Sequence, residues 1–372
     1  MGTSPAVFPA VNLYGRIDAS QGREYADETI IPTPCFDRSL GAWCPLETTS
    51  TDESEAPNAR MQTDVTVSIS IGTMPHPSPW IDFESLVDLL RNRTLAVLSG
   101  AGMSTESGIP DYRGPETENK DHTPIQYSEF IAEESTRRHY WARSAIGWPS
   151  FDAARPNDGH RALARLEAAG CLVGIITQNV DRLHQSAGSR RVVELHGALA
   201  EVECLDCGRI SGRRRLQARI NQLNPDWSNH AAEHTPDGDA DLPRSATQHF
   251  RVPDCAACGG VLKPNVVFFG ENTAPEPVAA AWTLLREADT LLVAGSSLTV
   301  YSGFRFVRGA ANANQPVGIV NLGDTRGTPL ANVHVDGHTG QVLPRLADVL
   351  GAPSLDSAPA SGDAISPSYR CG

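Results

Sequence analysis

Short apolar runs that end abruptly in glycine or polar residues recur along the chain, and they constrain its fold most strongly. The runs at 95–98, 172–176, 290–293 and 317–320 lead into SGAG, TQNVD, AGSS and NLG. In an open sheet of parallel strands, such turns lie at the carboxyl ends of buried strands. The sequence therefore predicts an α/β fold, a Rossmann-like parallel sheet with helices on both faces.

The first of these junctions has the chemistry of a phosphate-binding turn. Gly100, Ala101 and Gly102 open the stretch SGAGMSTESGIPDYRG, where backbone N–H groups at a helix start can approach a pyrophosphate. Thr105 stands where the usual fingerprint has its third glycine, and Gly108 follows three residues later. Taken alone, this pattern also fits an ordinary tight turn.

Two later junctions have the same physical character. The run at 290–293 leads into one turn, and the run at 317–320 leads into another. The residues concerned are Gly295, Ser296 and Ser297 in the first turn and Asn321, Leu322 and Gly323 in the second. Backbone amides and hydroxyls at such turns can bind phosphate or ribose oxygens. Both turns are therefore further candidates for a nucleotide site.

The stretch from Gln178 to Gly197 carries the groups best suited to chemistry. It places an amide pair and the Asp181 carboxylate after one apolar run, and His196 after a second. An imidazole has a reference pKa of about 6.5, which suits proton transfer near neutral pH. An isolated histidine would more readily be a core residue, and His184 is interpreted in that way. The surroundings of His196 favour a functional role.

Two Cys-x-x-Cys pairs, Cys204 with Cys207 and Cys255 with Cys258, predict a metal site. Two thiolates on each tight turn supply the four ligands of a tetrahedral structural zinc ion. The insert between the pairs is longer than the usual spacing of roughly 15 to 20 residues, and it should contain a helix near 213–223. Because four thiolates leave no open position, the zinc ion is expected to stiffen a flap without catalysing a reaction.

Composition excludes several classes of protein. The net charge of −13 argues against a sequence-specific or general nucleic-acid binder, although one arginine cluster is read as a solvated helix face or partner patch. No run approaches the roughly 18 apolar residues of a membrane span. The chain is expected to be soluble and intracellular. The arginines are Arg209, Arg213, Arg214, Arg215 and Arg219, and the isolated cysteines Cys35, Cys44, Cys171 and Cys371 are expected to be free thiols.

Together, these motifs resemble the sirtuins, which are NAD-dependent protein-lysine deacylases. The matching segments are GAGMSTESGIPDYRG, TQNVDRLHQSAGS, ELHG, the two cysteine pairs, NVVFFGE, VAGSSLTVYS and NLG, between residues 95 and about 345. Details such as YWAR and VYSGFRF resemble the class II branch typified by the mitochondrial enzyme. The Tyr-x-x-Arg pair with which another branch recognises acidic acyl groups is not evident after Arg113, so succinyl-lysine preference is not predicted.

The resemblance implies an organisation for the chain. Residues 1–80 would be a largely disordered extension, 81–350 the catalytic domain and 351–372 a flexible tail. Within the catalytic domain, the large part would comprise 81–114, 166–200 and 262–350, and the small part a helical module at 115–165 and a zinc module at 201–261. A monomer in the cytoplasm is expected, or in the mitochondrion if the source is eukaryotic.

The resemblance also implies which residues bind NAD and the acylated lysine. His196 would be the general base that takes a proton from a ribose hydroxyl. Nicotinamide, O-acyl-ADP-ribose and free lysine would be the products. Residues expected to contact NAD are Gly100, Ala101, Gly102, Thr105, Asp111, Arg113, Gln178, Asn179, Val180, Asp181, Gly295, Ser296, Ser297, Asn321, Leu322, Gly323 and Thr339. Those expected to contact the substrate are Val267, Phe268, Phe269, Gly270 and Tyr301.

Two other functions stay open at this point. Mono-ADP-ribosyl transfer to a protein is one, because class II relatives are often poor deacetylases. A non-catalytic module that binds NAD and docks a partner is the less favoured one, since QNVD and the His-Gly pair are intact.

Overall fold

The computed structural model describes residues 82–112, 124–227, 239–240 and 242–353, together with the backbone of two short strands. Contacts divide the chain into Met1–Gly72 and Thr73–Gly372. In the first unit, β1 (Phe36–Asp37) pairs antiparallel with β2 (Ala42–Trp43). Apart from these strands, the predicted disordered extension lies outside the described residues, as does most of the predicted tail.

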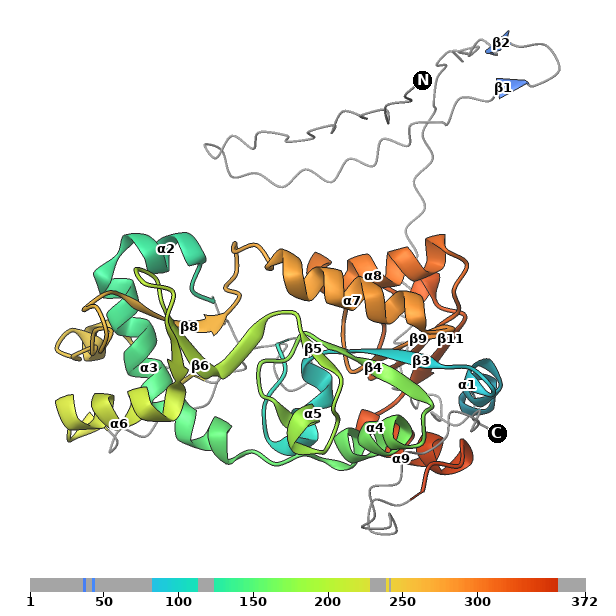
Figure 1. The fold of residues 1–372 in the computed structure, drawn as a ribbon, viewed down its shortest axis with the longest axis horizontal. Coiled ribbons are helices and arrows are strands. Elements are labelled where there is room, and N and C mark those ends of the chain that lie inside the picture. The colour runs from blue at the N-terminus through green and yellow to red at the C-terminus, as the bar shows by residue number, and fades with distance from the viewer. Residues whose placement is uncertain are drawn as a thin grey trace, which may run out of the picture. The chain divides into compact units, whose positions relative to one another are not determined.

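A six-stranded parallel sheet forms the centre of the second unit (Figure 1), which confirms the predicted fold class. Its order is β11-β10-β9-β3-β4-β5. The strands are β3 (Leu95–Ser99), β4 (Leu172–Thr177), β5 (Val192–Glu194), β9 (Thr290–Ala294), β10 (Val317–Asn321) and β11 (Val333–Asp336). The strand order reverses between β3 and β9, and the crevice at such a point is where α/β sheets bind ligands.

Helices cover both faces of this sheet. The helices α1 (Phe83–Leu90), α4 (Asp158–Ala168) and α9 (Thr339–Val349) pack on one face, and α7 (Pro275–Glu287) and α8 (Tyr301–Asn312) on the other. Side chains alternate between the two cores along β3, where Val97 joins the first cluster and Leu98 the second. Because both faces are covered, the strands consist of continuous apolar runs.

A smaller unit packs beside the sheet and contains the cysteine pairs. Its three antiparallel strands, in the order β7-β6-β8, are β6 (Gly197–Cys204), β7 (Ile210–Gly212) and β8 (Leu262–Val266). Its helices are α2 (Tyr127–Ala132), α3 (Glu134–Ala153) and α6 (Arg213–Leu223), the last of which confirms the predicted helix near 213–223. The short turns η4 (Arg244–Thr247) and η5 (Thr328–Leu330) complete the described helical elements beyond the site.

The core of this smaller unit corrects the interpretation of the arginine cluster. Trp141 is fully buried and Trp148 nearly so. Arg213, however, is only 1% exposed, because its guanidinium lies 5.4 Å from the Trp141 ring and 5.1 Å from the Trp148 ring. It also donates to the carbonyl and hydroxyl oxygens of Ser144. The prediction of a solvated face is therefore wrong for Arg213, although it holds for the exposed Arg214 and Arg215.

Two further observations concern single sequence predictions. Cys171 is buried and disulfide-bonded, so the expectation of a free thiol is wrong there, and its partner is not among the described residues. Within the described part of the chain, no helix has the length and apolar character needed to cross a membrane.

Candidate active site

A cavity of about 820 Å³ opens at the carboxyl ends of β3, β4, β9 and β10. The residues predicted from the sequence gather in its wall although they come from separate segments. Those lining it are Gly100, Ala101, Gly102, Thr105, Asp111, Gln178, Asn179, Val180, Asp181, His196, Val267, Phe268, Phe269, Gly270, Gly295, Ser296, Ser297, Tyr301, Asn321, Leu322 and Thr339. Gly323 is not among the described lining residues, and Arg113 lies outside the described residues.

The two glycine turns touch each other at the base of the cavity. The amide of Gly102 donates to the carbonyl of Gly295 at 2.9 Å. A Cβ on Gly295, whose φ is +61°, would lie 2.4 Å from the Met103 nitrogen, and one on Gly100 would lie 2.7 Å from Ser296 Cβ. Side chains larger than hydrogen therefore do not fit at either turn. Short turns follow the first one, η1 (Ala101–Met103) and η2 (Thr105–Ser107), in place of a long helix.

The turn after β4 is fixed by hydrogen bonds to the first glycine turn. The side-chain amide of Asn179 donates to the Gly100 carbonyl at 2.9 Å and to Ser104 Oγ at 3.1 Å. Ser104 in turn donates to the Asp181 carboxylate at 2.7 Å. Gln178 Nε2 donates to Ser296 Oγ at 2.8 Å. The three polar side chains of QNVD are therefore joined to both glycine turns. Ser104 was not predicted, although it lies inside the first motif.

Asp181 is a positioning group in this arrangement. Its second oxygen accepts the amide of Leu183 at 2.8 Å, at the start of the short helix α5 (Leu183–Ser186). Burial raises the pKa of Asp181 above its ordinary value, and the hydrogen bonds from Leu183 and Ser104 oppose this rise. A carboxylate whose two oxygens both accept fixed donors is held in one orientation.

His196 has one ring nitrogen anchored and the other directed at a hydroxyl. Nδ1 lies 2.9 Å from the Gln178 carbonyl oxygen, and Nε2 lies 2.8 Å from Ser302 Oγ. Because a carbonyl can only accept, Nδ1 carries the proton and Nε2 has the free electron pair. Burial lowers the pKa of His196, although the bond to the Gln178 carbonyl opposes this. The ring is therefore neutral at pH 7 and can accept a proton at Nε2.

Two of the residues around His196 were not found from the sequence. Ser302 and Arg305 both lie on α8 and line the cavity. Arg305 donates to the Ser302 carbonyl at 3.0 Å and contributes to the low pKa of His196. Both lie inside VYSGFRF, a motif noted in the sequence without a role for either residue. They stand more than 100 residues from His196 in the sequence, so only the fold shows that they are its neighbours.

The turn after β10 completes the other end of the cavity. The side-chain amide of Asn321 donates to the carbonyls of Leu322 and Gly323, each at 2.9 Å, and Gly323 N donates to Asp336 at 2.7 Å. Gly323 thus shapes the turn, with φ +73°, without lining the cavity. Thr339 approaches the Gly102 carbonyl at 3.4 Å, so it joins this end to the first glycine turn.

The predicted substrate edge lies next to His196. Val267 N donates to the His196 carbonyl at 2.9 Å. Farther along, Glu271 accepts the Phe268 amide at 2.8 Å and pairs with the buried Lys263 ammonium at 3.0 Å. The opposite side is marked by Tyr301, which is 54% exposed. Extended backbone with pinned ends, beside an exposed aromatic ring, is suited to adding a peptide as a further strand.

A Tyr-x-x-Arg spacing is present on α3, so the statement from the sequence that no such pair follows Arg113 is wrong. Tyr140 lines the cavity, but Arg143, three residues on, is not among the described lining residues. The Arg143 guanidinium donates to the Ala240 carbonyl at 2.8 Å and lies 4.0 Å from the Asp239 carboxylate. In this arrangement the arginine points toward the insert, so it does not place a cation in the cavity.

Four thiols converge in the small unit as the sequence predicts. The Sγ atoms of Cys204, Cys207, Cys255 and Cys258 all lie within 4.8 Å of one another. Two of the separations are 3.5 Å and 4.0 Å, close to the roughly 3.8 Å expected for four thiolates around one zinc ion with Zn–S bonds near 2.3 Å. The donor set therefore fits one structural zinc ion.

Comparison with known proteins identifies the same region. The family model described as the Sir2 family matches residues 100–302. A protein from Streptomyces coelicolor named NAD-dependent protein deacetylase 1 is 53% identical over 284 residues, covering 76% of this chain and 95% of that protein. The mitochondrial NAD-dependent protein lipoamidase sirtuin-4 of Bos taurus is 46% identical over 282 residues, covering 74% and 90% of the two chains.

Solved structures of Sir2 proteins also match this chain, at lower sequence identity. A Sir2 complex with a deacetylated p53 peptide and 3'-O-acetyl-ADP-ribose matches with a TM-score of 0.59 and 30% identity, over 72% of this chain and 98% of that one. Sir2Tm bound to a propionylated peptide matches with a TM-score of 0.57 and 29% identity, over 72% and 97%.

Proposed function

Because the chain belongs to the Sir2 family, we propose that it removes acyl groups from protein lysines in an NAD-dependent reaction with His196 as general base. The observation that carries this assignment is the ring orientation of His196. Its Nδ1 is anchored on the Gln178 carbonyl, and its Nε2 carries an electron pair in the cavity wall.

The residues present fit NAD. Gly100, Gly102 and Gly295 form turns whose backbone a Cβ would obstruct, as expected where a pyrophosphate approaches closely. Gln178, Asn179 and Asp181 would hold the nicotinamide ribose, and Ser296 with Asn321 the adenosine half. When bound, NAD supplies a sugar carbon from which nicotinamide leaves, so that the acyl oxygen can become attached there.

His196 contributes proton transfer. With Nδ1 fixed as a donor, Nε2 is the only ring position that can take a proton from a ribose hydroxyl. Ser302 Oγ occupies this position 2.8 Å away, so the serine must release Nε2 when a sugar hydroxyl arrives. Desolvation keeps the imidazole neutral, which preserves its capacity as a base down to pH values below about 6.5.

The acylated lysine enters between the Val267–Glu271 segment and α8. A peptide added as a strand would place its lysine beside His196, because Val267 N is bonded to the His196 carbonyl. The cavity wall beyond this point includes apolar residues such as Ile109, Ile125 and Leu199. We therefore favour uncharged acyl groups, from acetyl to longer chains of the lipoyl type, as substrates.

Mono-ADP-ribosyl transfer, the second enzymatic possibility from the sequence, gains no support from the relatives, which are named deacetylases and a lipoamidase. The two reactions differ in which molecule carries ADP-ribose afterwards: the released acyl group in deacylation, and the acceptor protein in ADP-ribosyl transfer. Mass spectrometry of the products separates them, because deacylation yields O-acyl-ADP-ribose and a peptide lighter by its acyl group. A cytoplasmic location and a monomeric state remain proposals from the sequence.

The decisive experiment follows nicotinamide release from NAD in the presence of acetyl-, lipoyl- and succinyl-lysine peptides. His196→Ala should lower kcat by roughly 10²- to 10⁴-fold, with zinc content kept at one ion per chain. His249→Ala, which changes an exposed histidine, is the control and should keep the wild-type rate. If His196→Ala turned over normally, the assignment of the base would be wrong.

A further inference from the structure

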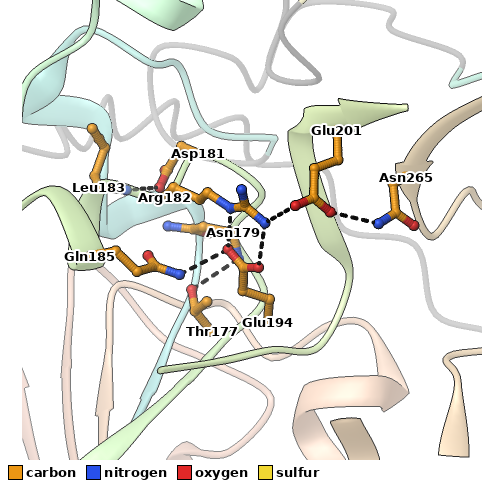
Figure 2. Close-up of polar contacts among 9 residues, drawn as sticks. All are labelled: Thr177, Asn179, Asp181, Arg182, Leu183, Gln185, Glu194, Glu201 and Asn265. Carbon is orange, nitrogen blue, oxygen red and sulfur yellow. Dashed lines mark hydrogen bonds and ion pairs between the residues drawn. The ribbon is translucent and has the colours of Figure 1, made fainter. Parts of the chain in front are cut away.

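Behind the cavity, one arginine joins three separate strands and the turn that carries QNVD (Figure 2). Arg182 donates from Nε to Glu194 at 3.1 Å and from Nη2 to Glu201 at 2.8 Å. The second oxygen of Glu201 accepts the side-chain amide of Asn265 at 2.9 Å. Glu194 belongs to β5, Glu201 to β6 and Asn265 to β8. We call these four residues the Arg182 cluster.

Three members of the Arg182 cluster lie within two positions of an active-site residue in the sequence. Arg182 directly follows Asp181, Glu194 is two residues before His196, and Asn265 is two residues before Val267. In the part of the chain that the structure describes, none of the cluster lines the cavity. The cluster therefore cannot contact NAD or peptide directly, and any effect on catalysis must act through these neighbours.

The pairing of β6 with β8 is irregular where the cluster joins these two strands. The pairing of β6 with β8 shifts register between Gly197 and Val202, so regular hydrogen bonding is interrupted opposite Asn265. Pro264 stands beside it and has no N–H to donate. At the same point Gly197 approaches so closely that a Cβ would lie 2.1 Å from the Asn265 carbonyl oxygen. The side-chain hydrogen bond from Asn265 to Glu201 thus joins β8 to β6 at the point where their regular pairing is interrupted.

Arg182 is also held in a conformation that a free chain would rarely choose. Its φ of +60° lies in the left-handed region, which is unfavourable for a residue with a Cβ. Although burial alone would raise the pKa of Glu201, hydrogen bonds from Arg182 and Asn265 keep it below its ordinary value. Glu201 therefore remains charged and paired at neutral pH.

We propose that Arg182 is a positioning residue that couples the two halves of the active site: through Glu194 and Glu201 it holds the NAD-binding turn in register with the strands that carry His196 and the peptide edge. Ligand at one half then stabilises the geometry that the other half requires. This inference rests on the proposed function, since it takes the two ligands to be NAD and an acylated peptide.

The test measures this coupling by calorimetry. The dissociation constant of an acetyl-lysine peptide is determined with and without saturating ADP-ribose, which occupies the NAD site without reacting. In the wild-type protein, ADP-ribose should tighten peptide binding at least fivefold, the lower end of typical coupling between sites. In Arg182→Met, the ratio of the peptide dissociation constant without ADP-ribose to that with ADP-ribose should fall to within twofold of one. The KM values for NAD and peptide should rise together.

A matched control is available in the same protein. Arg191 forms a bidentate ion pair with Glu287, and both side chains are about half exposed. This pair joins the residue before β5 to the end of α7, and neither residue lines the cavity. Arg191→Met therefore removes an equivalent ion pair and should leave the ADP-ribose effect on peptide affinity at its wild-type value. Arg182→Lys, which retains the charge but cannot reach both carboxylates, should give an intermediate ratio.

Two outcomes would overturn the proposal. One is a wild-type protein in which ADP-ribose does not change peptide affinity, and the other is a folded Arg182→Met variant that keeps the wild-type ratio. If Arg182→Met does not fold, Glu201→Gln decides, because it keeps the size of the side chain while removing its charge and one of its two acceptor oxygens. It should at least halve the ratio, and an unchanged ratio refutes the coupling.

Failure of the proposed function would look different. It would show as absence of nicotinamide release by the wild-type protein with every acylated peptide. The binding ratio is measured without turnover, so the coupling is accepted or rejected on its own result.

Discussion

Loops are fixed in two different ways in the two regions of this protein. At the six-stranded sheet, the glycine turns after β3 and β9 contact each other through backbone atoms and leave no space for a Cβ. In the small unit, four thiolates and a buried arginine between two tryptophans hold the segments together. The first arrangement leaves backbone groups exposed to a ligand. In the second, the polar groups contact one another or neighbouring side chains inside the unit. The comparison teaches that the first region presents backbone groups to a ligand, whereas the second supports the site and contributes part of the cavity wall, such as Tyr140.

The largest expected effect is loss of the metal site. Chelation, or Cys204→Ser, should unfold the small unit locally, because structural zinc contributes about 10 to 16 kcal/mol of apparent binding free energy in small zinc peptides. Hydrogen exchange should rise in β6, β7 and the 255–260 turn while β3 and β9 stay protected. Equal exchange in both regions would contradict the division between them.

A second change tests the close approach of the glycine turns. Gly295→Ala places a Cβ 2.4 Å from the Met103 nitrogen, so we expect the dissociation constant for ADP-ribose to rise by about tenfold or more, with a loss of roughly 1–3 kcal/mol in unfolding free energy. Gly170→Ala is the matched control, because Gly170 also has a positive φ but no atom within 4 Å of the added Cβ. It should keep wild-type ADP-ribose affinity.

A third change addresses the interior of the small unit. Burial lowers the pKa of Arg213 to about 10, yet the group stays charged at pH 7. Arg213→Met removes its contacts with Trp141, Trp148 and Ser144, and it should lower the free energy of unfolding by about 1–3 kcal/mol. The exposed Arg215→Met should change it by no more than about 0.5 kcal/mol. Neither variant should alter ADP-ribose affinity, and chemical denaturation with binding calorimetry checks both statements.

The smallest expected effect on stability at neutral pH concerns His160, a buried residue of α4. Burial lowers the pKa of His160 to about 4, whereas the unfolded imidazole titrates near 6.5. The unfolded state thus binds a proton first, so the free energy of unfolding falls as pH drops from about 6.5 toward about 4, by up to about 1.4 kcal/mol per pH unit. His160→Gln removes the contribution of His160, so the loss of stability between pH 7 and pH 5 should be about 2 kcal/mol smaller in the variant. The pKa values of His184 and His196 are also lowered by burial, so the variant keeps their contributions.

That substitution preserves the local cap, which makes the comparison clean. His160 is the third residue of α4 in a capping box with Asn157, and glutamine is a usual residue at this position. Denaturant titrations at pH 7 and pH 5 supply the measurement. An identical loss of stability in wild type and variant would show that His160 does not contribute to the acid sensitivity.

The parts of the protein that were predictable depend on short stretches of sequence. Apolar runs that end in Gly or polar turns indicate parallel strands, and all four runs are strands of the sheet. Two Cys-x-x-Cys pairs indicate one metal site, because each pair places two thiols on one turn. His196 and the QNVD turn could be identified because they directly follow such strands. Each of these signals is a short stretch of sequence, although the stretches themselves, such as the two cysteine pairs, can stand tens of residues apart.

Tertiary structure alone decided the contacts between distant segments. Arg213 looked like part of a solvated basic face, but α3 supplies two tryptophans that bury it. Ser302 meets His196 across 106 positions, and Glu201 meets Asn265 across 64. A carboxylate or hydroxyl gives no local sign of such a partner, because the pairing depends on how whole strands and helices pack. The sequence by itself determined which groups could react, and the packing of the two regions determined how those groups are held.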